Sequence, residues 1–297
     1  MNKILIFGST GFVGKALSNY LHSNGFEVYP RDGGGEIKKN KIRLELSNIQ
    51  EILNFINYNS IDTVLHLASN LVPDSSHNEF LIENTNLILA TQKLISSLSK
   101  KNIRFIFFSS GGQVYKESAS HHLETDTLMA QSYYGQSKIL IEQEIIKADS
   151  KNNFPYIILR PSNIYGVRSK NKSSQGIIPI FLNSIVSKKE IIIYGDGSKI
   201  RDYIYINDVI RIVSELIKNK NIKGTFNLAS NEEYTILEVL KFCENACDEK
   251  TKIVYRPDRS CDPHQTLFDN TKLIDSVNID LTALEDGIFQ MLNVING

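Results

Sequence analysis

A glycine-spaced segment at the start of the chain restricts its fold more than any other feature. Residues 4–7 are the apolar run Ile-Leu-Ile-Phe, which predicts a strand buried on both faces, as in a parallel sheet. The run leads directly into Gly8-x-x-Gly11-x-x-Gly14, and residues 15–23 have the pattern of a helix. A dinucleotide-binding fingerprint requires this order of strand, glycine turn and helix. The segment therefore predicts a dinucleotide site rather than a plain turn.

The three glycines have separate physical roles in such a site. One makes the tight turn, one lets the backbone approach a pyrophosphate, and one lets the helix pack against the strand. The helix N-terminus then faces the phosphates with backbone N–H groups and the positive end of its dipole. An acid about 20 residues further along accepts the ribose hydroxyls, and Asp32 stands there. Asp32 favours NAD, neighbouring Arg31 would attract the 2′-phosphate of NADP, and a third interpretation makes both residues solvated loop charges.

Length and composition limit the class of protein. The chain has 297 residues, of which 41% are hydrophobic, enough for a sizeable core. Its 33 basic and 33 acidic side chains balance, so no bulk charge favours nucleic acid or an anionic membrane as partner. No apolar run approaches the roughly 18 residues of a membrane span, and the N-terminus lacks a signal-peptide pattern. We therefore expect a cytoplasmic protein.

The cysteines favour neither a disulfide framework nor a metal site. The three are Cys243, Cys247 and Cys261, an odd and sparse set. Cys243 and Cys247 lie four residues apart on a predicted helix, but no histidine pair lies nearby. We therefore expect Cys243 and Cys247 to be small, buried hydrophobic side chains, and we expect no metal site.

Buried strands alternate with helices along much of the chain. Apolar runs predict strands at residues 25–29, 42–46, 63–69, 103–110 and 156–160, and helical spacing covers 48–58, 79–99 and the segment from 134 through 144. This alternation predicts a doubly wound parallel sheet flanked by helices. His66 lies inside one of the apolar runs, so we expect a core histidine rather than a catalyst.

A tyrosine and a lysine four residues apart form a candidate catalytic pair. Tyr134 and Lys138 share one face of a predicted helix. They follow both the dinucleotide turn and a strand that ends in the hydroxyls of Ser109 and Ser110. Tyr133 is adjacent, but only Tyr134 has a lysine four residues on.

These segments, in this order, resemble the extended branch of the short-chain dehydrogenase/reductase superfamily, and within it the NAD-dependent epimerase/dehydratase family. Residues 160–166 (R-P-S-N-I-Y-G), 178–181, 193–197 and 201–209 resemble motif blocks of nucleotide-sugar epimerases, so the resemblance covers nearly the whole chain. It implies a Rossmann-type sheet with a smaller C-terminal substrate-binding lobe. Residues 1–166 would form the NAD(P)-binding domain, 203–230 would return to it, and 167–202 and 231–297 would form the lobe.

The resemblance also implies residue roles. Tyr134 would be the general base, and Lys138 would lower its pKa and bind the nicotinamide ribose. Substrate contacts are expected at Asn163, Arg201 and Arg259. Cofactor contacts are expected at Gly8, Thr10, Gly11, Phe12, Val13, Gly14, Asp32, Glu45, Leu46, Leu67, Ala68, Ser69, Asn84, Ser109, Tyr134, Lys138 and Pro161.

One position departs from the family pattern. The family usually has a catalytic serine or threonine where this chain has Gly111. Ser110 is adjacent, and Gln113 would share a face with residue 111 if the strand alternation continued. Either side chain is therefore expected to hold the sugar oxygen.

The resemblance leaves three functions open. We expect an NAD-dependent nucleotide-sugar epimerase that acts as a homodimer in polysaccharide biosynthesis. The alternatives are an NAD(P)H-dependent 4-keto-sugar reductase and an inactive nucleotide-binding protein. Dehydration is disfavoured, because residues 111–113 read Gly-Gly-Gln where dehydratases have the T-D-E that eliminates water.

Overall fold

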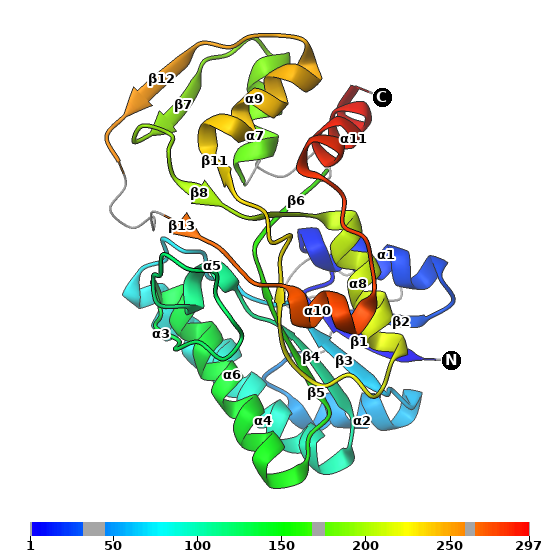
Figure 1. Cartoon of the computed structure of the whole chain (residues 1–297). Helices are drawn as coiled ribbons and strands as arrows, with labels where there is room; N and C mark the ends of the chain where they lie inside the picture. The colour runs from blue at the N-terminus through cyan, green and yellow to red at the C-terminus, as the bar shows by residue number, and fades with distance from the viewer. Residues whose placement is uncertain (1, 32–44, 168–175, 259–264, 297) are drawn as a thin grey trace. The chain divides into compact units, whose positions relative to one another are not determined.

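The computed structural model describes residues 2–31, 45–167, 176–258 and 265–296 (Figure 1). The chain divides into two compact units. The first comprises Met1–Lys116, Thr127–Arg160 and Ile210–Phe226, and the second comprises Glu117–Asp126, Pro161–Val209 and Asn227–Gly297.

The first unit is organised around a six-stranded sheet with the order β10-β5-β4-β3-β1-β2. The ladders that join β1 to β2 and β3, and β4 to β3 and β5, are all parallel. The strands are β1 (Lys3–Phe7), β2 (Glu27–Arg31), β3 (Thr63–His66), β4 (Arg104–Phe108), β5 (Tyr156–Pro161) and β10 (Gly224–Leu228). The predicted doubly wound parallel sheet is confirmed.

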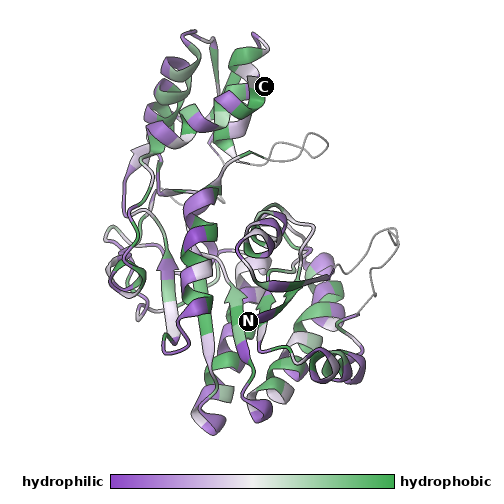
Figure 2. Cartoon of the chain, turned by 90° about the vertical axis from the view of Figure 1, so that its right-hand side faces the viewer, coloured by the Kyte–Doolittle hydropathy of each residue, from purple (hydrophilic) through white to green (hydrophobic). Residues whose placement is uncertain are grey.

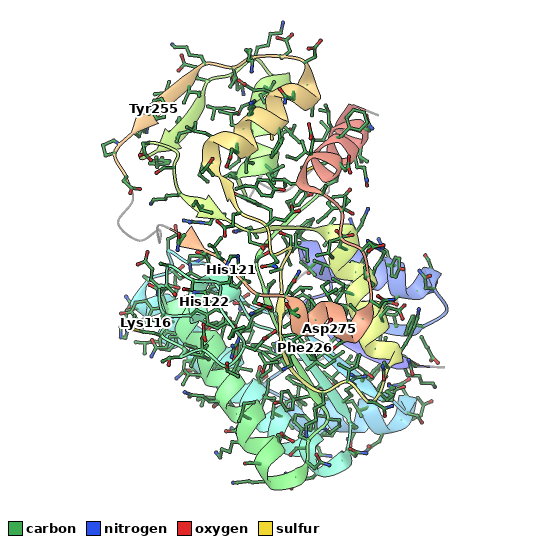
Figure 3. All side chains as sticks on the ribbon, in the orientation of Figure 1. Lys116, His121, His122, Phe226, Tyr255 and Asp275 are labelled. Atoms are coloured by element: carbon green, nitrogen blue, oxygen red, sulfur yellow. The ribbon has the colours of Figure 1, made fainter. Side chains whose placement is uncertain are left out.

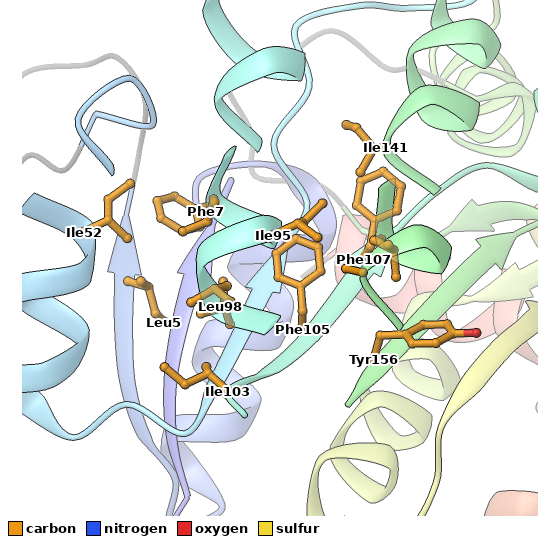
Figure 4. Close-up of a cluster of buried hydrophobic side chains, with 14 of the residues drawn as sticks. Leu5, Phe7, Ile52, Ile95, Leu98, Ile103, Phe105, Phe107, Ile141 and Tyr156 are labelled. Carbon is orange, nitrogen blue, oxygen red and sulfur yellow. The ribbon is translucent and has the colours of Figure 1, made fainter. Parts of the chain in front are cut away.

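Helices cover both faces of this sheet. The helical elements are α1 (Phe12–Ser23), α2 (Ile49–Asn59), α3 (His77–Glu83), η1 (Asn84–Ile88), α4 (Leu89–Leu98), η2 (Ser99–Lys101), α5 (Gly111–Val114), α6 (Tyr133–Asn152) and α8 (Ile206–Lys218). One buried cluster joins α2, α4 and α6 to the sheet through residues such as Ile52, Ile95 and Ile141, packed on Leu5 and Phe105 (Figure 4). The alternate strand residues are also buried, which is the pattern of a sheet covered on both faces; Figure 2 shows the strands largely in the hydrophobic colour.

Some predicted boundaries differ from the structure. Strand β2 runs past Pro30 to Arg31, which is tolerated because β2 is the last strand in the order of described strands. Of the strand predicted at 42–46, residues 42–44 lie outside the described residues, and Glu45 and Leu46 precede α2 in a turn. The helix predicted at 79–99 contains a π-helical segment, η1, between α3 and α4.

The second unit contains shorter strands and four helices of its own among the described residues. Its strands pair as β11-β8-β13, β12-β7 and β6-β9. Their bounds are β6 (Asn163–Tyr165), β7 (Ile191–Tyr194), β8 (Ile200–Arg201), β9 (Tyr203–Tyr205), β11 (Tyr234–Thr235), β12 (Ile253–Arg256) and β13 (Gln265–Thr266). The helices are α7 (Ile177–Val186), α9 (Ile236–Cys247), α10 (Thr271–Val277) and α11 (Leu284–Asn296). In Figure 3, Tyr255 marks the exposed face of β12, whereas His122 is a buried residue of this unit.

Only one of the cysteines is confirmed as a buried side chain. Cys243 is buried in α9 and Cys247 is partly buried, while Cys261 lies outside the described residues. Across the described ranges, no group of three or more His, Cys, Asp or Glu side chains is arranged to hold a metal ion. Among the same residues, no helix is both long and apolar enough to cross a membrane.

Candidate cofactor and catalytic site

The glycine turn has the geometry of a phosphate-binding loop. Gly8 has a φ of +84°, and a Cβ there would lie 2.7 Å from the Ala68 nitrogen. A Cβ at Gly14 would lie 2.1 Å from the Gly8 carbonyl oxygen, so these two glycines are required by the packing of the turn. Gly11 is different, because it has a φ of −65° and a Cβ there would meet only the Gly8 oxygen, at 3.3 Å.

The N-terminus of α1 fits a bound pyrophosphate. Its N-cap residue, Gly11, makes no side-chain cap, and the first turn of the helix has no acidic residue. A negative group placed there is stabilised by the backbone N–H groups and the helix dipole, without competition from a carboxylate. The turn lies at the carboxyl end of β1. Strand β1 has β2 on one side and β3 on the other, so this end is a topological switch point of the sheet.

The remaining cofactor predictions fall largely along the same carboxyl edge. Leu67, Ala68 and Ser69 directly follow β3, and the Leu67 nitrogen donates to the Phe7 oxygen at 2.9 Å. Ser109 directly follows β4, and Pro161 is the last residue of β5. Their contacts with a cofactor stay predictions, as does the contact expected at Asn84, the first residue of η1.

Arg31 is not a solvated loop charge. Its side chain is buried, its guanidinium carbon lies 4.4 Å from the centroid of the Phe55 ring, and Nη1 donates to the Pro30 oxygen at 2.8 Å. The interpretation of Arg31 as an exposed charge is therefore wrong. Asp32 lies outside the described residues, and Glu45 is exposed.

Tyr134 and Lys138 lie on one face of α6, as predicted. The Lys138 ammonium lies 5.3 Å from the centroid of the Tyr134 ring and donates to the Phe108 carbonyl oxygen at 3.0 Å. The neighbouring Tyr133 points elsewhere, because its ring stacks on Phe80 with the centroids 5.5 Å apart. The structure thus separates the two tyrosines that are adjacent in sequence.

Burial changes the acidity of both members of this pair. It lowers the pKa of Lys138 to about 8, against the opposing charges of Glu83 and Glu142. Burial also raises the pKa of Tyr134, while a side-chain hydrogen bond with Ser110 lowers it. A phenol that has to act as a base near neutral pH needs groups that favour its anion, and Ser110 is such a group.

The two side chains expected to compensate for Gly111 have different surroundings in the structure. Ser110 is the N-cap residue of α5, and its hydroxyl lowers the pKa of Tyr134. The Gln113 Oε1 instead accepts from the Ser132 hydroxyl at 2.7 Å, and that hydroxyl caps the N-terminus of α6. The expectation that Gln113 shares a face with residue 111 is wrong, because β4 ends at Phe108 and residues 111–114 are helical, which turns residue 113 about 200° away.

His66 is a core histidine, as predicted. It is fully buried at the end of β3, and its Nε2 lies 3.0 Å from the Thr91 hydroxyl. Burial, followed by the charge of Lys138, lowers its pKa to about 3. The imidazole is therefore neutral at physiological pH.

The second unit holds the residues predicted to bind substrate. Asn163 is exposed, and its Nδ2 donates to the Asp202 carbonyl oxygen at 2.8 Å. Arg201 lies in β8 between β11 and β13, and its Nη1 donates to the Ile200 oxygen at 2.8 Å. Arg259 lies outside the described residues.

The two acids of residues 201–209 have structural partners. The buried Asp202 carboxylate accepts from the backbone nitrogens of Ser230 and Asn231, at 3.0 and 2.7 Å. The Asp208 carboxylate accepts from the Thr282 nitrogen at 2.8 Å and the Thr282 hydroxyl at 3.0 Å. Both acids therefore fix the backbone of segments distant in sequence.

Sequence reasoning missed the buried pair Glu142 and Arg160. The Arg160 Nη2 donates to Glu142 Oε2 at 2.6 Å, and both side chains are almost fully enclosed. The available signals were a carboxylate four residues beyond Lys138 and a single arginine at the end of an apolar strand. A charge in such a run requires a partner.

The chain is similar to known sugar-nucleotide enzymes over almost its whole length. It is 29% identical to dTDP-4-dehydro-6-deoxyglucose reductase of Escherichia coli, over 99% of this chain and 98% of that protein. It is 27% identical to a putative UDP-glucose 4-epimerase of Methanocaldococcus jannaschii, over 98% and 97%. A crystal structure of UDP-glucose 4-epimerase with UDP-glucose, from Thermotoga maritima, aligns with a TM-score of 0.87 at 25% identity, covering 100% of this chain and 99% of that one.

A family model matches the segment that contains both the glycine turn and the Tyr134–Lys138 pair. The match covers residues 4–229 and is to the NAD dependent epimerase/dehydratase family. It agrees with the parallel sheet and with the phosphate-binding geometry of its first turn. The chain therefore belongs to the NAD-dependent epimerase/dehydratase family, and its cofactor is NAD.

Proposed function

We propose that this protein is an NAD-dependent nucleotide-sugar epimerase. The observation that carries the proposal is the arrangement of Tyr134, Lys138 and Ser110 at the carboxyl edge of the dinucleotide-binding sheet. A base, a cation and a hydroxyl donor meet there. These are the groups needed to remove a proton from a sugar hydroxyl while hydride leaves the same carbon.

The residues have separate tasks in this mechanism. Bound NAD supplies the capacity to accept and return a hydride. The Tyr134 phenolate takes the proton of the sugar hydroxyl, and the Ser110 hydroxyl holds the sugar oxygen in place of the side chain that residue 111 lacks. A protonated Lys138 stabilises the phenolate by charge. Epimerisation requires the sugar to present its other face before Tyr134 gives the proton back.

The site also supports specific cofactor contacts. Gly8, Thr10, Gly11, Phe12, Val13 and Gly14 form the turn and the first residues of α1, so we propose that they contact the pyrophosphate. Lys138 is proposed to donate to the nicotinamide ribose. Asp32 is proposed to bind the adenosine ribose hydroxyls and to discriminate against NADP.

We propose that residues 1–166 form the NAD-binding domain with 203–230, and that 167–202 and 231–297 form the substrate-binding lobe. The compact units differ from this division, because the second unit also includes residues 117–126, 161–166, 203–209 and 227–230. Asn163, Arg201 and Arg259 are proposed to bind the nucleotide sugar. Arginine suits a diphosphate, because its guanidinium offers paired donors to phosphate oxygens. We also propose that the enzyme is cytoplasmic and supplies polysaccharide biosynthesis.

A 4-keto-sugar reductase is the second candidate, and one observation favours it. The relative at 29% identity is named as a reductase of this kind. The epimerase is preferred because residues 193–197 and 201–209 resemble epimerase blocks, and because the matched Thermotoga maritima structure is an epimerase.

The two functions make different demands on NAD, so one experiment separates them. An epimerase keeps its NAD and regenerates it, whereas a reductase consumes a reduced cofactor. The purified protein should be assayed with UDP-glucose, UDP-N-acetylglucosamine and dTDP-glucose without added cofactor, and the products examined by NMR. Formation of a C4 epimer supports the proposal. A second assay supplies a nucleotide 4-keto sugar with NADH or NADPH. Turnover in this assay alone, with stoichiometric loss of the reduced cofactor, would replace the epimerase with the reductase.

A further inference from the structure

Three consecutive residues at the end of β4 bind three successive turns of one face of α6. The Phe108 carbonyl oxygen accepts from the Lys138 ammonium, and the Ser109 hydroxyl donates to the Glu142 carboxylate. The Ser110 hydroxyl lies close enough to the Tyr134 phenol to lower its pKa. Tyr134, Lys138 and Glu142 follow one another at intervals of four residues, so they lie on the same side of the helix. The register of α6 on the strand end is therefore set by two hydrogen bonds, from Lys138 and to Glu142, and this register places Tyr134 beside Ser110.

The contact between Ser109 and Glu142 belongs to a buried charge pair, Glu142 and Arg160. This pair also binds Tyr115, at the other end of the segment 109–115 that carries Ser110. The Arg160 Nε donates to both Glu142 oxygens at 3.2 Å, and its Nη2 donates to Oε2 at 2.6 Å. The Arg160 Nη1 donates to the Tyr115 hydroxyl at 2.9 Å. Ser109 and Tyr115 are the two ends of the segment that carries Ser110. Both ends are thus tied to one ion pair.

We infer that Ser109, Glu142 and Arg160 form a positioning network that fixes Tyr134 against Ser110. This inference rests on the proposed function, in which Tyr134 is the base. None of the three acts on the substrate. Their task is to hold the helix that carries the base and the loop that carries the hydroxyl in one relative position, because reacting groups that move by about 1 Å can lose about 10²-fold in rate.

The burial of the network agrees with a fixed geometry. Ser109, Glu142, Arg160 and Tyr115 are each at most 5% exposed. A buried carboxylate is stable only when paired and hydrogen-bonded, and Glu142 accepts from both a guanidinium and a hydroxyl. Glu142→Gln would leave the Arg160 charge without its partner and would unfold the protein too readily to be informative. Ser109→Ala removes one hydroxyl and leaves the ion pair, so it is the informative variant.

Ser99 offers a matched control. Its side chain is also buried, its hydroxyl donates to the Ser96 oxygen at 3.2 Å, and it accepts from Asn152 at the last turn of α6. Ser99→Ala therefore removes a comparable hydrogen bond at the other end of the same helix. If the Ser109 hydroxyl only stabilised the fold, Ser109→Ala and Ser99→Ala would have similar effects on the enzyme.

The test combines kinetics with a readout that needs no turnover. Tyrosine labelled with ¹³C at Cζ is incorporated into the wild type, Ser109→Ala and Ser99→Ala, and the Tyr134 resonance is assigned with Tyr134→Phe. Ser109→Ala is expected to move this resonance and to lower kcat about 10- to 100-fold with KM unchanged, while Ser99→Ala changes neither. A Tyr134 resonance and kcat that stay at wild-type values in Ser109→Ala, or that change equally in Ser99→Ala, would overturn the inference. If the wild type turned over no nucleotide sugar, the proposed function would fail, and the resonance alone would decide the positioning inference.

Discussion

At the scale of one residue, the buried ammonium of Lys138 makes the stability of the fold depend on pH. Its ammonium is buried, and burial lowers its pKa from 10.5 to about 8. Below pH 8 the folded protein has to hold this charge away from water. Between pH 8 and 10.5 the unfolded chain binds more protons than the folded one, so stability from this group rises with pH in that window.

We therefore expect Lys138→Met to be more stable than the wild type at pH 7, by up to about 3 kcal/mol, and to lose the rise in stability between pH 8 and 10.5. Activity should fall at the same time, because the phenolate of Tyr134 loses its cation. Urea unfolding at several pH values and steady-state kinetics measure the two effects. A variant less stable than the wild type at pH 7 would show that the Phe108 hydrogen bond outweighs the cost of burial.

The glycine turn is the element in which packing and cofactor binding can be separated. Gly14 faces the backbone of the turn, whereas little of the protein lies where a Gly11 Cβ would stand. A side chain at position 14 has to displace backbone atoms, but one at position 11 would intrude mainly on the space of the pyrophosphate.

We expect Gly11→Ala to keep nearly the thermal stability of the wild type but to bind NAD much more weakly. Gly14→Ala should instead lower the Tm of the protein even without bound NAD. A contact of 2.1 Å between the new Cβ and a backbone oxygen cannot be relieved by a rotamer change. Thermal melts and NAD titration of both variants check this. Equal NAD affinity in Gly11→Ala and the wild type would place the pyrophosphate elsewhere.

Elements that depend on local spacing were predictable, and those that depend on distant contacts were not. The face shared by Tyr134 and Lys138 follows from helical periodicity alone. Residues 111–114 pack tightly on α6, since a Cβ at Gly135 would lie 2.1 Å from the Gln113 oxygen, and this contact joins residues 22 apart in the sequence. Arg31 is buried by Phe55, which is 24 residues away.

At the scale of the whole molecule, three helices of the first unit carry large hydrophobic side chains that are exposed within the chain. Exposed hydrophobic side chains lie on α3, α4 and α6, namely Leu81, Ile82, Leu89, Tyr133 and Ile146. We propose that a second copy of the chain covers them in a homodimer, since α3 and α4 both pack against α6 and apolar side chains exposed close together mark interaction sites.

The dimer is expected to have twice the 33.6 kDa mass of the chain at micromolar concentration. Ile146→Asp should shift it toward monomer without unfolding it, because that side chain is exposed within the chain. Analytical ultracentrifugation measures both. A monomeric wild type would contradict the dimer.

The role of Tyr134 as the general base is tested most directly by removing its hydroxyl. Tyr134→Phe should lower kcat for a nucleotide sugar by about 10² to 10⁴, because the proton acceptor is gone, while substrate affinity and NAD binding stay close to wild type. Tyr133→Phe is the matched control, since the Tyr133 ring stacks on Phe80 while the Tyr134 ring is the one near the Lys138 ammonium, and it should keep the wild-type rate. Turnover by Tyr134→Phe at the wild-type rate would contradict the mechanism.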